Sequence, residues 1–295
     1  MKGIILTNAY YCPPDVMYQP ERLQEEFSAR GVRADIRRND FFPFRLKKGE
    51  LQSLLGDYGF CIYLDKDKYV LQSIEKCGMR VYNSYRAIAA CDDKMTTCLA
   101  LSGLGIPMPD TLPGLLCYSP AEKVRKESLV QVSETLGFPL VVKEAYGSLG
   151  KGVYLAHDMA ELSAIAEKIK CVPHLFQKFI ASSYGKDLRV IVVGDRVAGG
   201  MLRESAEGFR SNLGAGGSGR SYPVSDRIAA LSLKIAKNLG LDYCGIDFLF
   251  GEGEEMLVCE VNSNAFFKGF EQATGVNVAG MFAEHVLSDL EKIKG

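Results

Sequence analysis

The chain has 295 residues, 47% of them hydrophobic, which is enough to bury a sizeable core in two domains or in one domain with subdomains. Its 35 basic and 36 acidic residues nearly balance, so composition excludes binding to nucleic acid or to an anionic membrane that is driven by excess charge. The N-terminal apolar run ends at Asn8, and we expect neither a signal peptide nor a transmembrane span.

Strand and helix patterns alternate over residues 1–86, and the helices end at Gly31 and Gly78. This β-α-β order implies a parallel sheet covered by helices, so we predict a small Rossmann-like domain. No glycine-rich loop follows the first strand, and a nucleotide is therefore expected to bind elsewhere. The predicted strands are GIILTNA (3–9), VRADIRR (32–38), YGFCIYL (58–64) and MRVYNS (79–84), and the helices are ERLQEEFSARG (21–31) and KYVLQSIEKCG (68–78).

A second unit, of the α+β kind, is predicted over residues 87–180 and a C-terminal unit over 181–295, so the fold class combines α/β and α+β parts. The second unit has helices over 91–105, 128–137 and 159–170, and strands over 138–146, 153–158 and 174–180. The C-terminal unit has a hairpin over 187–205 that turns at 194–195, strands over 243–250 and 255–262, and helices over 225–240 and 277–294.

The cysteines indicate a reducing compartment. They are nine, an odd number, and none forms the C-x-x-C pair that zinc and redox sites use. Most lie in apolar runs, where buried free thiols are common, so we expect packing roles and a cytoplasmic location. The nine are Cys12, Cys61, Cys77, Cys91, Cys98, Cys117, Cys171, Cys244 and Cys259.

Gly214, Gly216 and Gly219 have the G-x-G-x-x-G spacing of a dinucleotide-binding loop. That loop needs a buried strand before its first glycine and a helix that opens on its last. Here polar ESAEGFRSN precedes the glycines, and Pro223 separates them from the next helix. We therefore reject a dinucleotide site at this position.

The strands around GEGEE bring acidic residues together. A hairpin symmetric about 251–256 places Phe250 opposite Leu257, and therefore Asp247 opposite Glu260. Because side chains alternate along a strand, Asn262 shares the face of Glu260. Three oxygen-bearing side chains suit Mg²⁺, which would relieve the repulsion of two carboxylates in a mostly buried sheet. The alternative is that both acids end in solvent or pair with Lys or Arg.

Lys143 interrupts an apolar strand and is followed by a glycine-rich loop, GSLGKG (147–152). Successive backbone N–H groups in such a loop can surround phosphate oxygens, and its glycines allow close approach. The loop is not a Walker A motif, because Lys151 is followed by Gly152 and position 145 is Ala. A flexible hairpin turn with a strand-end lysine in water remains the alternative.

The strand over 174–180 leads into the next unit, and a segment joining two domains commonly binds a purine. Beyond it, Asp187 and Arg189 share one face of a strand, with a surface ion pair as the alternative to a functional role. Neither feature is decisive by itself.

Taken in order, these segments resemble the ATP-grasp superfamily and, within it, the RimK-like carboxylate-amine ligases. The resemblance covers about residues 84–288. It depends on eight motifs in the right order: DDKMTTCLALSGLGIPMPDT, FPLVVKEAYGSLGKGV, FQKFI, GKDLRVIVVGDRV, FRSNLGAGG, GIDFLF, EVNSN and FEQATGVNVA. It implies an ATP-grasp fold after an N-terminal Rossmann-like (pre-ATP-grasp) domain.

The resemblance also implies roles for individual residues. It implies that Lys94 and Lys143 contact the phosphates of ATP and that loop 147–152 closes over those phosphates. It also implies that Asp247, Glu260 and Asn262 bind Mg²⁺, or alternatively Mn²⁺. Arg210 and Asn212 would be catalytic beside the γ-phosphate, and Arg189 is our candidate for substrate binding. The full ATP-binding set is Lys94, Lys143, Gly147, Ser148, Gly150, Gly152, Gln177, Lys178, Phe179, Ile180, Asp187, Arg210, Ser211 and Asn212.

The implied reaction phosphorylates a carboxylate with ATP and lets an amine attack the acyl phosphate. The expected substrates are a small-molecule or peptide carboxylate and an amine, where the amine is an amino acid such as glutamate. The resemblance also implies a homodimer as one assembly. Three positions depart from the family pattern: Lys178, SNAFFKGFE (263–271) and the glycines after Leu213. A non-catalytic ATP-binding sensor or assembly module is the alternative.

Overall fold

The computed structural model describes residues 1–148, 150–205, 208–209 and 217–294. Within them lie three sheets of four, four and five strands and one separate two-stranded hairpin. One sheet is parallel and the other two are antiparallel, so the predicted mixture of α/β and α+β parts is confirmed.

The N-terminal sheet is parallel, as predicted, with strand order β2-β1-β5-β6. Helix α1 begins at Pro14, seven residues before the predicted start, because proline is preorganised for a first helical turn. Pro20 consequently lies inside this helix. The elements are β1 Lys2–Thr7, α1 Pro14–Ala29, β2 Arg33–Arg38, β5 Phe60–Leu64, α2 Lys68–Lys76 and β6 Arg80–Tyr82.

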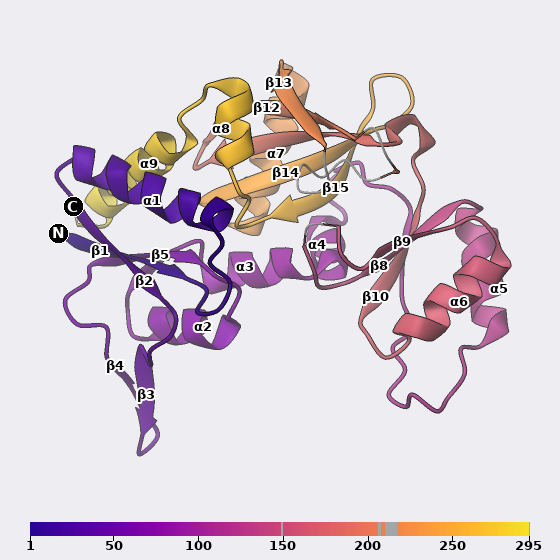
Figure 1. Ribbon diagram of the computed structural model, residues 1–295, viewed down its shortest axis with the longest axis horizontal. Coiled ribbons are helices and arrows are strands. Elements are labelled where there is room, and N and C mark those ends of the chain that lie inside the picture. The colour runs from indigo at the N-terminus through magenta and orange to yellow at the C-terminus, as the bar shows by residue number, and fades with distance from the viewer. Residues whose placement is uncertain (149, 206–207, 210–216, 295) are drawn as a thin grey trace.

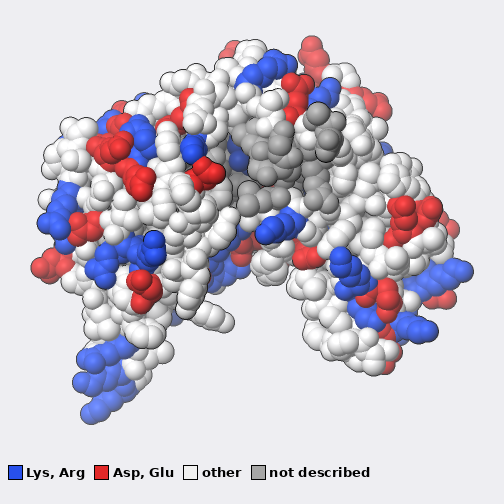
Figure 2. Space-filling view, in the orientation of Figure 1, with Lys and Arg blue, Asp and Glu red and all other residues white. Residues whose placement is uncertain are grey.

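A hairpin that was not predicted, β3 (Phe44–Lys47) with β4 (Glu50–Ser53), projects from this domain (Figure 1). Its turn contains Lys48 and Gly49, both with positive φ, which is the backbone that a tight two-residue hairpin requires. Figure 2 shows Lys and Arg side chains gathered on the projection, whereas the rest of this face carries mixed charge.

The second sheet is antiparallel, with order β7-β10-β8-β9. Helices α5 and α6 lie side by side against it (Figure 1) and share its core. Helix α5 ends before Gly137, whose φ is 70°, as the sequence predicted. The elements are β7 Thr111–Pro113, α5 Lys126–Leu136, β8 Leu140–Glu144, β9 Val153–Ala156, α6 Met159–Ile169 and β10 His174–Lys178.

The third sheet has order β13-β12-β11-β14-β15, and the predicted hairpin turn at 194–195 is confirmed. Helix α7 starts after Ser225, whose side chain caps it, and ends at Gly240 in the left-handed conformation. The elements are β11 Lys186–Val193, β12 Arg196–Glu204, β13 Ser218–Tyr222, α7 Asp226–Leu239, β14 Tyr243–Phe250 and β15 Met256–Asn262.

The remaining helices connect these layers. The predicted helix over 91–105 is shorter, because Asp93 caps a new helix, α4, and ends the one before it, α3. A 3-10 turn, η1, and helix α8 were not predicted. The bounds are α3 Tyr85–Asp92, α4 Lys94–Leu101, η1 Ala181–Ser183, α8 Lys268–Thr274 and α9 Val278–Lys294. Among all described helices, none combines the length and the apolar character needed to cross a membrane.

Four hydrophobic cores hold the described parts together, and one of them packs α2 against the N-terminal sheet. Another joins the N-terminal sheet and α1 to α9 and to one face of the third sheet. A third covers the opposite face of the third sheet with α7, α3 and α4. The second sheet has a core of its own with α5 and α6. The division at 86 and 180 stays a prediction, but the third sheet is packed on both faces and the second sheet forms a separate lobe.

Candidate active site

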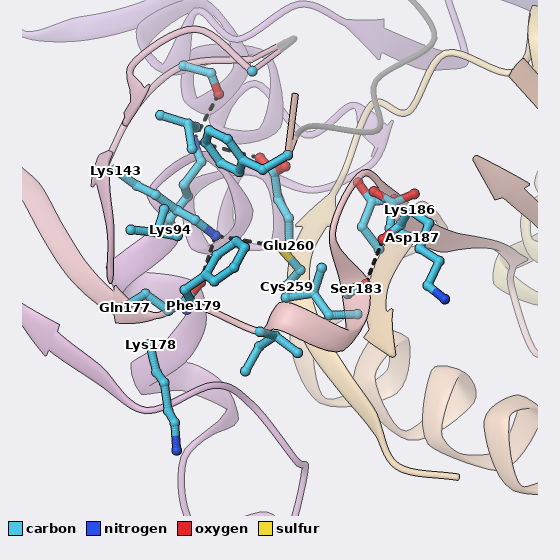
Figure 3. A pocket seen from close by; sticks show the side chains of 18 of the residues that line it. Lys94, Lys143, Gln177, Lys178, Phe179, Ser183, Lys186, Asp187, Cys259 and Glu260 are labelled. Atoms are coloured by element: carbon cyan, nitrogen blue, oxygen red, sulfur yellow. Dashed lines mark hydrogen bonds and ion pairs between the residues drawn. The ribbon is translucent and has the colours of Figure 1, made fainter. Parts of the chain in front are cut away.

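One open cavity lies between the second and third sheets and is lined from β8, β10, β11, β14, β15, α4 and the loop after β8 (Figure 3). Many of the predicted site residues meet here, although they are far apart in the sequence. Those that line the cavity are Lys94, Lys143, Gly147, Ser148, Gly150, Gln177, Lys178, Phe179, Ile180, Asp187, Asp247 and Glu260.

Strand alternation directs Lys143 into the cavity. In β8, Leu140 and Val142 belong to the core, while Val141 and Lys143 line the cavity. The lysine is only 7% exposed, and its Nζ donates to Gln177 Oε1 at 2.7 Å. Gln177 in turn donates from Nε2 to Thr111 Oγ1 at 2.9 Å. The side chain of Gln177 therefore orients the lysine, which the sequence did not predict.

Lys94 bridges the loop and the acidic side of the cavity. It is the first residue of α4, and its backbone N–H donates to Ala145 O at 3.0 Å. Its Nζ lies 3.1 Å from Gly147 O and 3.7 Å from Glu260 Oε1. Two ammonium groups thus face the same space, an arrangement that suits phosphate oxygens.

The glycine-rich loop closes back on β8. The carbonyl of Gly152 accepts a hydrogen bond from the Glu144 N–H at 2.8 Å. Gly152 has a φ of 69°, and a Cβ at this position would lie 2.7 Å from the Glu144 side chain. This position therefore requires glycine. Gly152 supports the loop, whereas Gly147, Ser148 and Gly150 line the cavity.

The register of β14 and β15 brings the two predicted metal ligands together, but not by the route predicted. Phe250 lies opposite Met256, so its predicted pairing with Leu257 is wrong. A bulge shifts the register between Asp247 and Phe248, and Asp247 lies opposite Glu260 as predicted. Because the bulge adds one residue to β15, Cys259 and Glu260 both line the cavity.

Asp247 and Asp187 are held by arginines. Arg189 contacts Asp247 with both ends of its guanidinium, Nε to Oδ1 and Nη2 to Oδ2, each at 2.7 Å. Arg203, which was not predicted, contacts Asp187 at 2.6 and 2.5 Å and reaches Asp247 Oδ2 at 3.0 Å. The predicted alternative of an ion pair between Asp187 and Arg189 is wrong, because each has another partner across the sheet. Asp247 instead pairs with two arginines, as expected under the alternative to a metal site, in which the acids pair with Lys or Arg.

Burial and charge act in opposite directions on Asp247. Burial disfavours its charged form, but Arg189 and Arg203 outweigh burial and hold the pKa of this carboxyl below its ordinary value. Burial likewise opposes the charge on Arg203, yet Asp247 and Asp187 raise the pKa of its guanidinium. Asp247 and Arg203 therefore stay ionised, and Asp247 presents a carboxylate.

The donor set fits Mg²⁺. Asn262 lies beside Asp247, with Nδ2 3.3 Å from Oδ2, and Glu260 stands opposite across the strand pair. Two carboxylates and an amide oxygen are hard ligands, and Mg²⁺ commonly takes one or two carboxylates, leaving positions for water and phosphate. No group of three or more His, Cys, Asp or Glu side chains in the described ranges could hold a metal ion. A site here would thus depend on phosphate and water for its remaining ligands.

The segment over 177–180 borders the cavity where the two lobes meet. Phe179 packs edge-on with Tyr184 and Phe209, each with ring centroids 6.3 Å apart. Lys178 points away from Lys94 and Glu260 (Figure 3), toward Asp110 at 4.0 Å. The ammonium group of Lys178 therefore does not face the space that the ammonium groups of Lys94 and Lys143 share.

Some predicted residues are not among the cavity lining. Arg189 and Asn262 contact Asp247 but do not line the cavity, and Arg210, Ser211 and Asn212 lie outside the described residues. Sequence reasoning missed several lining residues, because their positions depend on the bulge, on strand register or on η1. They are Val141, Val153, Ser183, Lys186, Leu249 and Cys259, whereas Lys151 belongs to the predicted loop 147–152 and Phe209 to the motif FRSNLGAGG.

Curated relatives resemble most of this chain. Human N-acetylaspartylglutamate synthase A is 41% identical over 226 residues, 76% of this chain and 56% of that protein. Human beta-citrylglutamate synthase B is 40% identical over 76% of this chain and 57% of that protein. A probable alpha-L-glutamate ligase of Halorhodospira halophila is 35% identical over 74% of this chain and 70% of that protein. The chain spans little more than half of the two human proteins.

Solved structures share the fold across nearly the whole chain. D-alanine–D-alanine ligase from Bacillus anthracis, complexed with ATP, has a TM-score of 0.74 at 17% identity and covers 99% of this chain and 98% of its own. The ligase PsnB, complexed with minimal precursor, Mg and ADP, has a TM-score of 0.70 at 19% identity and covers 98% of each chain. The predicted ATP-grasp fold is thereby confirmed. The family model of the RimK-like ATP-grasp domain matches residues 91–286, and the chain belongs to this family.

Proposed function

We propose that the protein is an ATP- and Mg²⁺-dependent ligase that joins a carboxylate to an amine and forms ADP. The observation that carries this proposal is the cavity itself, in which Lys94 and Lys143 face Asp247 and Glu260. Cations for phosphate oxygens and oxygen ligands for a metal then border one space, as phosphoryl transfer requires.

Each residue would have a distinct role in this reaction. When bound, Mg²⁺–ATP supplies the phosphoryl group and neutralises part of its charge. Lys94 and Lys143 would bind phosphate oxygens, and the hydrogen bond that Lys143 donates to Gln177 keeps this lysine in its orientation. Asp247, Glu260 and Asn262 would hold the metal, and segment 177–180 would hold adenine. Arg210, Ser211 and Asn212 remain predicted to act beside the γ-phosphate.

Fixed charges can supply most of the catalysis. Negative charge develops first on the transferred phosphoryl group and then on the oxygen of the attacked acyl phosphate, and preorganised cations stabilise both. Lys143 and Lys94 meet this need because their ammonium groups are held by hydrogen bonds to Gln177 and Gly147. Positioning of the acid and the amine supplies much of the remainder.

For the substrates, we propose glutamate as the amine and a small-molecule or peptide carboxylate as the acid. The names of the similar ligases support this proposal, since each includes glutamate. All nine cysteines are free thiols, which supports the proposed cytoplasmic location.

The test is ADP formation with pairs of acids and amines. The protein is incubated with Mg²⁺–ATP, glutamate and a panel that includes N-acetylaspartate, citrate and peptides with a C-terminal glutamate, and products are identified by mass spectrometry. We expect ADP and an amide product only with a matching pair. Binding of ATP without ADP formation from any pair would contradict the proposal and favour the non-catalytic module.

A further inference from the structure

Two arginines share the carboxylate of Asp247, and they hold it differently. Arg203 is 4% exposed and also forms a bidentate pair with Asp187. Arg189 is 15% exposed, and Asp247 is its one carboxylate partner within the described ranges. Moving Arg203 would break its contacts with two buried carboxylates, whereas moving Arg189 would break its contacts with one. Arg189 is therefore the more readily displaced of the two.

The hydrogen bonds of Asp247 leave little room for another cation. Oδ2 already lies near three nitrogen donors, from Arg189 at 2.7 Å, Arg203 at 3.0 Å and Asn262 at 3.3 Å. A carboxylate oxygen has two lone pairs, so these donors saturate it. Mg²⁺ repels nearby guanidinium groups and needs oxygen lone pairs free of donors. Oδ1 accepts from Arg189 Nε at 2.7 Å and keeps its second lone pair among the described contacts. Because Arg189 contacts both oxygens, metal ligation through either one places Mg²⁺ against this guanidinium.

We propose that Arg189 is an exchangeable counter-ion of Asp247, which Mg²⁺ displaces. This inference depends on the proposed function and adds a role to it: the released guanidinium becomes available to the carboxylate of the acid substrate. Arg203 remains in place and keeps Asp187 and Asp247 oriented. A planar guanidinium suits a carboxylate because it can donate two parallel hydrogen bonds to it.

Metal affinity without turnover tests the exchange. With ADP at a saturating concentration, we titrate Mg²⁺ and measure the concentration that gives half of the maximal rise in Tm. The equilibrium between Mg²⁺ and ADP in solution is then the same for all variants. Arg189→Gln removes the competing charge, and we expect it to bind Mg²⁺ roughly tenfold more tightly than the wild type. Arg189→Lys keeps the charge and is expected to stay close to the wild type. Arg196→Gln, on β12 and paired with Glu284, is the matched control and should not change.

Several outcomes would overturn the exchange. If Arg189 merely supports the geometry of Asp247, Arg189→Gln will bind Mg²⁺ as the wild type does or more weakly. Tighter Mg²⁺ binding in Arg189→Lys than in the wild type would show that charge is not the cause, and this comparison does not depend on whether the glutamine variant folds. A wild type that binds no Mg²⁺–ADP at all would contradict the proposed function as well.

The second part concerns the acid substrate. With the acid that supports ADP formation, Arg189→Lys should raise the KM for that acid about tenfold or more, because lysine cannot make the bidentate contact. The KM for glutamate should stay unchanged. An unchanged KM for the acid would overturn this part and leave the proposed function standing.

Discussion

Glu260 is the residue whose role is most sharply defined by its neighbours. It stands opposite Asp247 and reaches Lys94 at 3.7 Å. In the proposed function, its charge would bind the metal and orient a lysine that binds phosphate. Glu260→Gln keeps the shape of the side chain and removes that charge. We expect ADP formation to fall at least about 100-fold with an unchanged fold, since charge stabilisation is the main catalytic term here.

Steady-state assays with circular dichroism would check this expectation. Glu255→Gln, an exposed position just before β15, is the control and should retain wild-type turnover. Wild-type turnover in Glu260→Gln would refute the assignment of this residue.

Arg203 should matter to stability as much as to chemistry. It is buried, and it neutralises two carboxylates that are themselves buried. Arg203→Met leaves Asp187 and Asp247 without this guanidinium, and we expect a loss of roughly 3–5 kcal/mol in the free energy of unfolding. Urea denaturation would measure the loss. Arg196→Met, at an exposed pair, should cost less than about 1 kcal/mol, and equal losses in both variants would contradict the interpretation.

Among the elements, α1 carries a charged cluster that depends on pH and that contacts Asn277, the residue before α9. Burial of Glu26 on α1 disfavours its charged form. Hydrogen bonds from Arg30, Asn277 and Arg22 outweigh burial and lower the pKa of its carboxyl to about 2. A folded-state pKa below the unfolded value stabilises the fold above the unfolded value of 4.5, and that stabilisation disappears as the pH falls toward 2.

We therefore expect Glu26→Gln to be less stable than the wild type at pH 7, with the difference shrinking between pH 4.5 and 2. Urea unfolding at a series of pH values would measure it. A difference that stays constant over this range would show that the charge of Glu26 does not contribute.

Local patterns predicted many of the elements and the residues that face the cavity. Alternation in β8 was sufficient to place Lys143, and glycine stops placed the ends of α5 and α7. The bulge in β15 could not be predicted, because no sequence signal marks Cys259 as an extra residue. The contacts of Arg203 also escaped prediction, because they depend on the registers of β11, β12 and β14 together.

At the scale of the whole molecule, the N-terminal domain shares a core with the rest of the chain. Ile5 and Phe27 pack in one cluster with Phe282 and Val286 of α9. A chain that starts at residue 87 would expose this apolar surface to water, and we expect it to be insoluble or largely unfolded. Soluble expression and circular dichroism would check this, and a folded, monomeric fragment would contradict the shared core.

In the proposed reaction, ATP activates the acid through its carboxylate. An acid labelled with oxygen-18 in that carboxylate tests it most directly, when it is turned over with ATP and glutamate and the released phosphate is analysed by mass spectrometry. Because an acyl phosphate passes one carboxylate oxygen to phosphate when the amine attacks, we predict one labelled oxygen in each phosphate released. Unlabelled phosphate formed together with the amide product would contradict the account.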